Sequence, residues 1–168
     1  MALREMWVNG HAATIEVHRV GRGPDQDVNG VPWTSVIGLR LGWGVVYRCA
    51  AGSDHWFHFA VPTLAVDDGV RARLCRATVL FTAGEGATLQ GLHVWDGPTR
   101  AFARDGLTIG GGNPTPIDGR NSFEIAGHHV RCGIGVSAHF HFAEDSDVTL
   151  HGAGIELDLR AATRARGN

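Results

Sequence analysis

Short runs of alternating hydrophobic and polar residues recur along the chain, and turn residues separate them. Strict alternation predicts half-buried β-strands, because successive side chains of a strand point to opposite faces. Asn29-Gly30, Asp68-Gly69 and Asp96-Gly97-Pro98 are typical turn signals between such runs. We therefore predict strands near residues 5–9, 12–20, 36–41, 43–50, 55–61, 74–83, 87–95, 100–104, 121–125, 129–142 and 147–159.

Helical periodicity is missing, since no window repeats hydrophobic residues at the spacing of a helix face. Only residues 160–166 are suited to a short helix, and they serve equally well as a polar tail. Many short strands with frequent turns predict an all-β protein, either a single-domain antiparallel β-sandwich (jelly-roll-like) or a β-barrel. We expect the domain to span residues 1–159, with a polar C-terminal tail over residues 160–168.

Two segments rich in glycine, proline and aspartate, residues 21–34 and 105–120, are predicted loops. Loops of this length are uncommon and often carry function. Trp33 lies in the first loop, where it is either a ligand platform or an anchor that packs the loop down. Trp56 and His58 share one face of an aromatic strand and form a second candidate binding surface for a sugar or another ring, unless a partner strand covers it.

Residues 133–142 and 147–157 are predicted to pair as an antiparallel hairpin around the short acidic turn Glu144-Asp145-Ser146. Each segment has one apolar face, and matching these faces specifies the parity of the pairing. The two glycines in Gly152-Ala153-Gly154 predict a bulge, after which the alternation changes parity.

Three histidines would gather on one face of this hairpin. His151 would lie across from His139 or His141, so that the three imidazoles are neighbours. A His-x-His pair on one strand and a third His on the next are able to bind zinc or another divalent transition metal, with one position open to water. A solvated outer face and a metal-free patch that responds to pH are the alternatives.

Charge and cysteine content narrow the function classes. The 15 basic residues are all arginine, 17 residues are acidic, and the net charge is -2. A net charge this close to zero does not generate a positive electrostatic potential that would attract nucleic acid or an anionic membrane. No apolar run is long enough to span a bilayer. Cys49, Cys75 and Cys132, an odd number without a secretory leader, indicate reduced thiols and a cytoplasmic location.

Several short phrases stand in a defined order along the chain: Trp56-Phe57-His58, Val61-Pro62-Thr63, Asp67 to Leu74, Val79-Leu80-Phe81, Leu92 to Gly97 and Gly133 to Ser137. Their order and spacing resemble an uncharacterised bacterial family of small single-domain proteins of unknown function, over roughly residues 1–155. The resemblance implies a stand-alone cytosolic domain and supplies no active-site residues.

These features favour a soluble binding or self-assembling domain that recognises a small molecule or a partner protein. Self-association into a homo-oligomer would cap exposed sheet edges. The alternative is a small enzyme, either metal-dependent through the three histidines or a cyclase-type barrel acting on an apolar small molecule. Neither nucleic acid nor a membrane is an expected partner, and a divalent transition metal such as zinc is the only cofactor that the pattern indicates.

Overall fold

The computed structural model describes residues 3–15, 36–111 and 118–160. Within these ranges the chain forms strands and one 3₁₀ turn, and no helix is long and apolar enough to cross a membrane. The all-β prediction is therefore confirmed.

The predicted loop 21–34, Trp33 and most of the segment 160–166 lie outside the described residues. In chain order the elements are β1 (Leu3–Asn9), η1 (Gly10–Ala12), β2 (Thr14–Ile15), β3 (Val36–Leu41), β4 (Gly44–Cys49), β5 (Ser53–Val61), β6 (Val66–Asp67), β7 (Val70–Arg71), β8 (Arg73–Ala83), β9 (Ala87–Asp96), β10 (Thr99–Gly110), β11 (Ser122–His129), β12 (Ile134–Phe142) and β13 (Ser146–Asp158).

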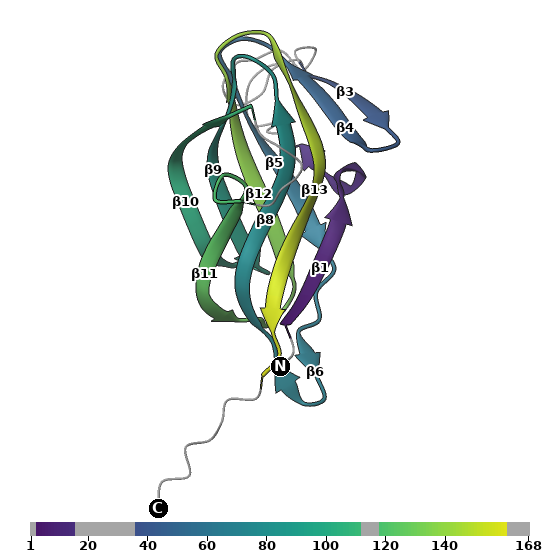
Figure 1. The fold of residues 1–168 in the computed structure, drawn as a ribbon, viewed down its shortest axis with the longest axis vertical. Helices are drawn as coiled ribbons and strands as arrows, with labels where there is room; N and C mark the ends of the chain where they lie inside the picture. Colours follow the sequence, from purple (N-terminus) through teal and green to yellow (C-terminus); the bar gives the residue numbers. More distant parts are fainter. Residues whose placement is uncertain (1–2, 16–35, 112–117, 161–168) are drawn as a thin grey trace, which may run out of the picture.

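The strands form two antiparallel sheets that pack face to face (Figure 1). The first sheet has the order β11-β8-β13-β4-β3, and β1 pairs with the half of β13 that β4 does not reach. The second sheet has the order β10-β9-β12-β5-β2, and β6 pairs with β7 in a small separate ribbon. Neither sheet closes into a barrel, so the barrel alternative is wrong and the fold is a sandwich. Its jelly-roll-like connectivity stays a prediction.

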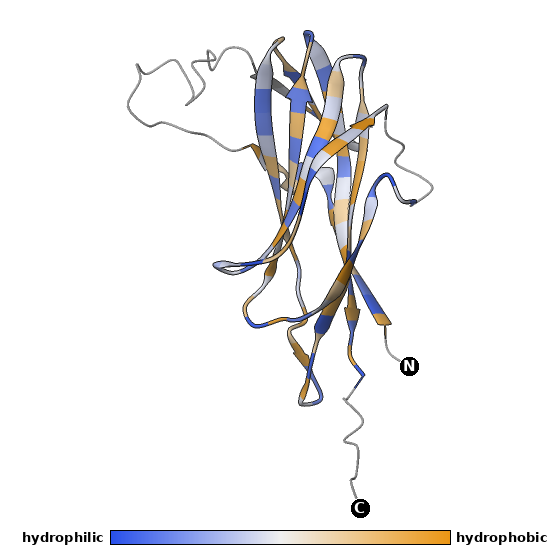
Figure 2. Ribbon diagram, turned by 90° about the vertical axis from the view of Figure 1, so that its left-hand side faces the viewer, coloured by the Kyte–Doolittle hydropathy of each residue, from blue (hydrophilic) through white to orange (hydrophobic). Residues whose placement is uncertain are grey.

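Aromatic side chains from both sheets meet in the middle of the core. The ring centroid of Phe140 in β12 lies 5.9 Å from that of Phe57 in β5 and 5.1 Å from that of Phe81 in the opposite sheet. Both pairs are edge-to-face, an arrangement that the ring quadrupoles favour. All three side chains are fully buried. Hydrophobic and hydrophilic positions alternate along the strands, which directs such side chains into the core (Figure 2).

β12 and β13 belong to different sheets, so the predicted hairpin of residues 133–142 with 147–157 is wrong. β12 pairs with β5 and β9, whereas β13 pairs with β8, β4 and β1. Residues 143–145 thus carry the chain from the second sheet to the first. The apolar faces of both strands are buried as expected, but they lie on the two sides of the core. An apolar pattern is satisfied equally by strands that pair within a sheet and by strands that pack across a sandwich.

β13 contains the predicted bulge. Its register with β8 shifts between Leu150 and Gly152. The buried apolar positions are Val148 and Leu150 before the shift, and Ala153 and Ile155 after it. The apolar side of the strand therefore changes parity at the bulge, as predicted.

β10 continues to Gly110, so the predicted loop over residues 105–120 is wrong in its first part. The register of β10 with β9 shifts between Asp105 and Ile109, and Gly106 inside this shift has a φ of 70°. Glycine adopts a positive φ without steric cost. The strand therefore accommodates the turn-like residues in an irregularity instead of ending at them.

Two backbone segments approach β13 closely beside its bulge. A Cβ atom at Gly10 would lie 1.9 Å from the Leu150 carbonyl oxygen, and one at Gly44 would lie 2.6 Å from the same atom. The turn η1 and the start of β4 therefore pack backbone to backbone against β13. A side chain at either position would force the two segments apart.

We expect Gly10→Ala to lower the free energy of unfolding by about 1–3 kcal/mol, the usual cost of overpacking a close contact. Urea denaturation followed by tryptophan fluorescence measures this change. Gly42→Ala is the matched control, because a Cβ atom at Gly42 would have no heavy atom of the described residues within 4 Å. An equal loss of stability in both variants would contradict the role of the close approach.

Candidate binding face on the second sheet

The outer face of the second sheet gathers polar and aromatic side chains from four neighbouring strands. β12 lies between β5 and β9, and His139 is opposite Trp56 on one side and Gly91 on the other. Residues opposite each other in neighbouring strands share a face. We call this surface the His–Trp face, and its members are Asp54, Trp56, His58, His93, Trp95, Asp105, Gly135, Ser137, His139 and His141.

Trp56 contacts two imidazole rings. Its ring stacks on His139 with the centroids 4.7 Å apart and the planes at 17°. The centroid of His93 lies 4.6 Å from that of Trp56, with the planes at 46°. The side chains of His139 and His93 are only 21% and 14% exposed. Trp56 therefore packs against both imidazoles and limits the positions that they can take.

Two carboxylates hold the imidazoles from the two sides of the face. Asp54 Oδ1 lies 3.1 Å from Nδ1 of His141 and 3.4 Å from Nε2 of His139. Asp105 Oδ1 lies 2.8 Å from Nε2 of His93. An ionised carboxylate only accepts hydrogen bonds, so the ring nitrogens are the donors. Asp54 and Asp105 are 39% and 68% exposed, so both remain accessible to a ligand.

Burial lowers the pKa of His139 below its ordinary value of 6.5, because an imidazolium ion loses hydration at this site. The charges of Asp54 and Asp105 oppose this effect, while His141 and His93 add to it. The balance favours the neutral imidazole of His139 in the folded protein.

The row of Trp95 and Gly135 is less crowded than the rest of the His–Trp face. Trp95 is 36% exposed, and the guanidinium carbon of Arg100 lies 6.0 Å from its ring centroid. Gly135 is paired with Trp95 on one side and with the exposed Ala60 on the other. Among the described residues, a Cβ atom at Gly135 would have only the Phe59 carbonyl oxygen within 4 Å, at 3.8 Å. This row therefore combines an exposed indole with open space beside it.

The pairing of β12 with β5 joins two candidate surfaces that the sequence presents separately. Ser137 is opposite His58, and its Oγ lies 2.8 Å from Nδ1 of His58. Trp56 and His58 share a face as predicted, and a neighbouring strand adds His139 and His141 to it.

His151 lies on the first sheet, so the predicted cluster of His139, His141 and His151 is wrong. Its Nε2 is 3.1 Å from Oγ1 of Thr82, and its ring stacks on Trp43 with the centroids 5.5 Å apart. Across residues 3–15, 36–111 and 118–160, no three or more His, Cys, Asp or Glu side chains form a group that could hold a metal ion. The zinc hypothesis therefore loses the third ligand on which it depended.

Sequence reasoning did not select His93, Trp95, Asp54 or Asp105. The alternation of β9 does place His93 and Trp95 on one face, which was a usable signal. Asp54 falls just before a predicted strand and Asp105 at the start of a predicted loop. Their place on the face follows from strand ends and strand neighbours, which a single sequence defines poorly.

The three cysteines are free thiols in different environments. Burial raises the pKa of Cys49 to about 12 and also raises the pKa of the half-buried Cys75. A raised pKa makes a thiol a poor nucleophile at neutral pH. Cys132 is exposed.

Comparison with known proteins places the chain in a family. Residues 33–157 match a family of unknown function (DUF6623). The chain belongs to this family. The expected resemblance to an uncharacterised family is thereby confirmed, and no curated protein matches the chain.

One solved structure is similar at a low level. It is described as "Crystal structure of Agl-KA catalytic domain", with 13% sequence identity and a TM-score of 0.31. The match covers 100% of this chain and 30% of that chain. A similarity of this size carries no argument about the function of the DUF6623 protein.

We expect the stability of the protein to fall as the pH drops below 6.5, in part through His139. Because its folded-state pKa is lowered, the unfolded chain binds more protons in this window, so acid favours unfolding. His139→Gln should flatten the fall, because it removes the titrating group. Asp54→Asn should steepen it, because Asp54 opposes the lowered pKa.

The measurement is urea unfolding at a series of pH values from about 8 to about 5. The slope of the unfolding free energy against pH is compared between variants, since each substitution also changes stability at neutral pH. Equal slopes in the wild type and His139→Gln would contradict the prediction.

Proposed function

We propose that the protein is a ligand-binding β-sandwich domain that holds a neutral saccharide against the His–Trp face. The observation that carries the proposal is the row of Trp95 and Gly135, an exposed indole beside open space, on a face edged by two accessible carboxylates. The ligand would be an oligosaccharide, because Asp54 is opposite His141, six residues along β12 from Gly135, a distance of about 20 Å.

The apolar part of the ligand would lie against Trp95. A pyranose presents a face of C–H groups, which packs well on an aromatic ring of negative quadrupole. Gly135 and Ala60 leave the neighbouring backbone nearly bare, and this allows a rigid ring to approach closely. The guanidinium carbon of Arg100 lies 6.0 Å from the indole centroid, so this side chain would be a hydrogen-bond donor for the ring hydroxyls.

The polar part of the ligand would meet fixed acceptors. Asp54 and Asp105 are each already bound to an imidazole, so they are oriented before a ligand arrives. Sugar hydroxyls would donate to these carboxylates, and charge-assisted hydrogen bonds of this kind are strong. The same two negative charges would repel an anionic ligand, and this favours a neutral saccharide.

The enzyme alternatives have less support. The metal-dependent version relied on His151 in a cluster that does not form, and the cyclase-type version relied on a barrel, whereas both sheets are open. The cytoplasmic location of the protein stays a prediction.

The test is a glycan array of neutral oligosaccharides, followed by calorimetric titration of the tightest binder. Trp95→Ala should weaken binding about tenfold or more, the cost typical of an aromatic anchor at a binding surface. Trp43→Ala is the matched control, because Trp43 is 57% exposed but lies on the hairpin of the first sheet. Absence of any glycan binding, or an equal effect of the two substitutions, would overturn the proposal.

Self-association is a second function that a specific observation favours. Within the described residues β3 pairs only with β4 and is an edge strand of the first sheet. The β3–β4 hairpin projects from the sandwich (Figure 1) and carries Leu39 and Trp43, which are 58% and 57% exposed. A second copy of the same edge would pair with it around a two-fold axis and cover both side chains.

Light scattering coupled to size-exclusion chromatography should then give the mass of a dimer at micromolar concentration. The double variant Leu39→Ser, Trp43→Ser should elute as a monomer, while Trp95→Ala should stay dimeric because Trp95 lies on the other sheet. A monomeric wild-type protein would rule out this assembly.

A further inference from the structure

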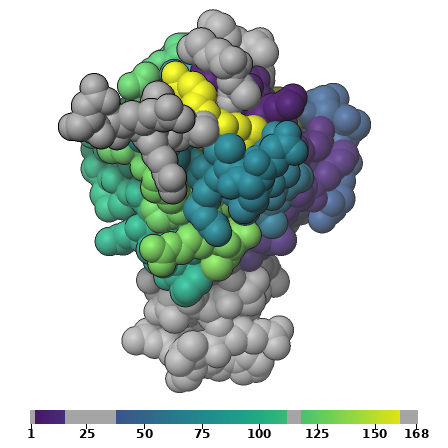
Figure 3. Space-filling model, turned by 90° about the horizontal axis from the view of Figure 1, so that it is seen from below, coloured from purple at the N-terminus to yellow at the C-terminus, as the bar shows by residue number. Residues whose placement is uncertain are grey.

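A basic cavity lies at the end of the sandwich where β9 passes into β10. It has a volume of about 360 Å³ and is lined by Thr99, Gly127, His128, His129 and Arg131. This volume is within the range of small-molecule sites. Figure 3 views the molecule from this end, and the green segment around residue 130 lies there against the teal segment around residue 72. Among the residues that the structure describes, the lining holds two imidazoles, one guanidinium and a hydroxyl, and no acidic side chain.

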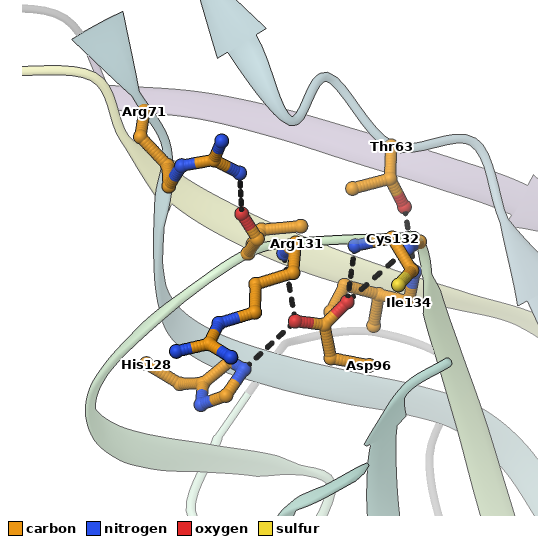
Figure 4. A network of polar contacts seen from close by, with 9 residues as sticks. Thr63, Arg71, Asp96, His128, Arg131, Cys132 and Ile134 are labelled. Atoms are coloured by element: carbon orange, nitrogen blue, oxygen red, sulfur yellow. Dashed lines mark hydrogen bonds and ion pairs between the residues drawn. The ribbon is translucent and has the colours of Figure 1, made fainter. Parts of the chain in front are cut away.

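A buried carboxylate organises the wall of this cavity (Figure 4). Asp96, whose side chain is 1% exposed, accepts backbone hydrogen bonds from Arg131 at 2.7 Å, Cys132 at 2.8 Å and Gly133 at 3.2 Å. It also accepts one from Nε2 of His128 at 2.9 Å. Burial acts to raise the pKa of Asp96, but these donors outweigh burial, and the pKa is lowered from its ordinary value. The carboxylate is therefore ionised and fully engaged.

The contacts of Asp96 decide what the cavity presents to a ligand. Since Nε2 of His128 donates to Asp96, Nδ1 is the ring nitrogen left for other partners. The same carboxylate binds the backbone N–H of Arg131. The backbone from which the exposed Arg131 side chain extends is therefore held in place. Two of the cationic or hydrogen-bonding groups of the cavity are thus oriented before a ligand binds.

Two further arginines increase the positive charge beside the cavity. Arg73 is opposite His129 in the register of β8 with β11, and a Cβ atom at Gly127 would lie 2.2 Å from its Nη2. Arg71 donates from Nη1 to the carbonyl oxygen of Val130 at 2.8 Å. In the part of the chain that the structure describes, no carboxylate forms an ion pair with Arg131 or His129.

The nearby acid Asp158 does not neutralise this surface. It is opposite Arg73 in the register of β13 with β8, but its carboxylate is bound by the guanidinium of Arg160 at 2.7 and 2.9 Å. That pairing lowers the pKa of Asp158 to about 2. The negative charge of Asp158 is thus already neutralised by Arg160.

We propose that this cavity binds a tetrahedral oxyanion, the phosphate or sulfate group of a small ligand or the free ion. Arg131 would supply a planar pair of N–H donors, which suits two oxygens of such a group. His129 and Thr99 would supply single donors to the remaining oxygens, whereas the Nε2–H group of His128 already donates to Asp96. The proposal is independent of saccharide binding at the His–Trp face, because it uses none of that face's residues.

The test is a titration of isotope-labelled protein with inorganic phosphate at constant ionic strength, followed by amide chemical shifts. We expect saturable shifts centred on residues 127–133, with a single dissociation constant. Arg131→Gln should weaken binding about tenfold, since one charge-assisted contact pair is lost. His129→Gln is a second variant at an exposed position, and it should weaken binding to a smaller extent.

Arg48→Gln is the matched control. It removes the same charge from the opposite end of the first sheet, where Arg48 is bound to Asp147 at 2.8 Å. Equal weakening by Arg131→Gln and Arg48→Gln, or shifts that do not saturate, would overturn the proposal.

A parallel titration with glycerol 3-phosphate distinguishes the two sources of the anion. Tighter binding of this ester than of inorganic phosphate supports a phosphorylated ligand, and weaker binding supports the free ion. Binding of neither probe would overturn the assignment of the cavity.

Discussion

The two-residue repeat of β12 ties the hydrophobic core to the His–Trp face. Phe140 packs against Phe57 in its own sheet and against Phe81 in the opposite one, so its neighbours His139 and His141 must point outward. A slip of one residue against β5 would turn the imidazoles into the core and lose both aromatic contacts. Packing in the core therefore sets the register in which His139 contacts Trp56. The positions of the side chains on the outer face follow from that register.

Asp96 plays a comparable part at the end of the second sheet. It is the last residue of β9 and is opposite Ile134, the first residue of β12. Its carboxylate binds the three backbone N–H groups that precede β12, so the entry of that strand is fixed by one buried charge. Removing one partner of a buried charge usually costs several kcal/mol, which makes Asp96 a structural residue as well as an organiser of the basic cavity.

Alternation in the sequence was sufficient to predict most strands, the faces of β5 and β12, and the bulge near Gly152. It was not sufficient to predict which strands are neighbours. The apolar faces of β12 and β13 match each other whether the strands pair or face each other across a core, and only the second arrangement occurs. The cluster with His151 failed for this reason, while the contacts of Trp56 with His139 and His93 depended on two pairings that connect distant parts of the chain.

The pairing of β1 with β13 has a consequence for how the chain folds. Leu3 is opposite Asp158, so the earliest described strand acquires its partner only after the latest one has been synthesised. Contacts between residues so far apart in sequence carry a large entropic cost of loop closure, and they slow folding. During synthesis β1 would remain unpaired until β13 is available. Its exposed Trp7 then has no access to Gly154, the position that its ring covers in the folded sandwich, until β13 has been synthesised.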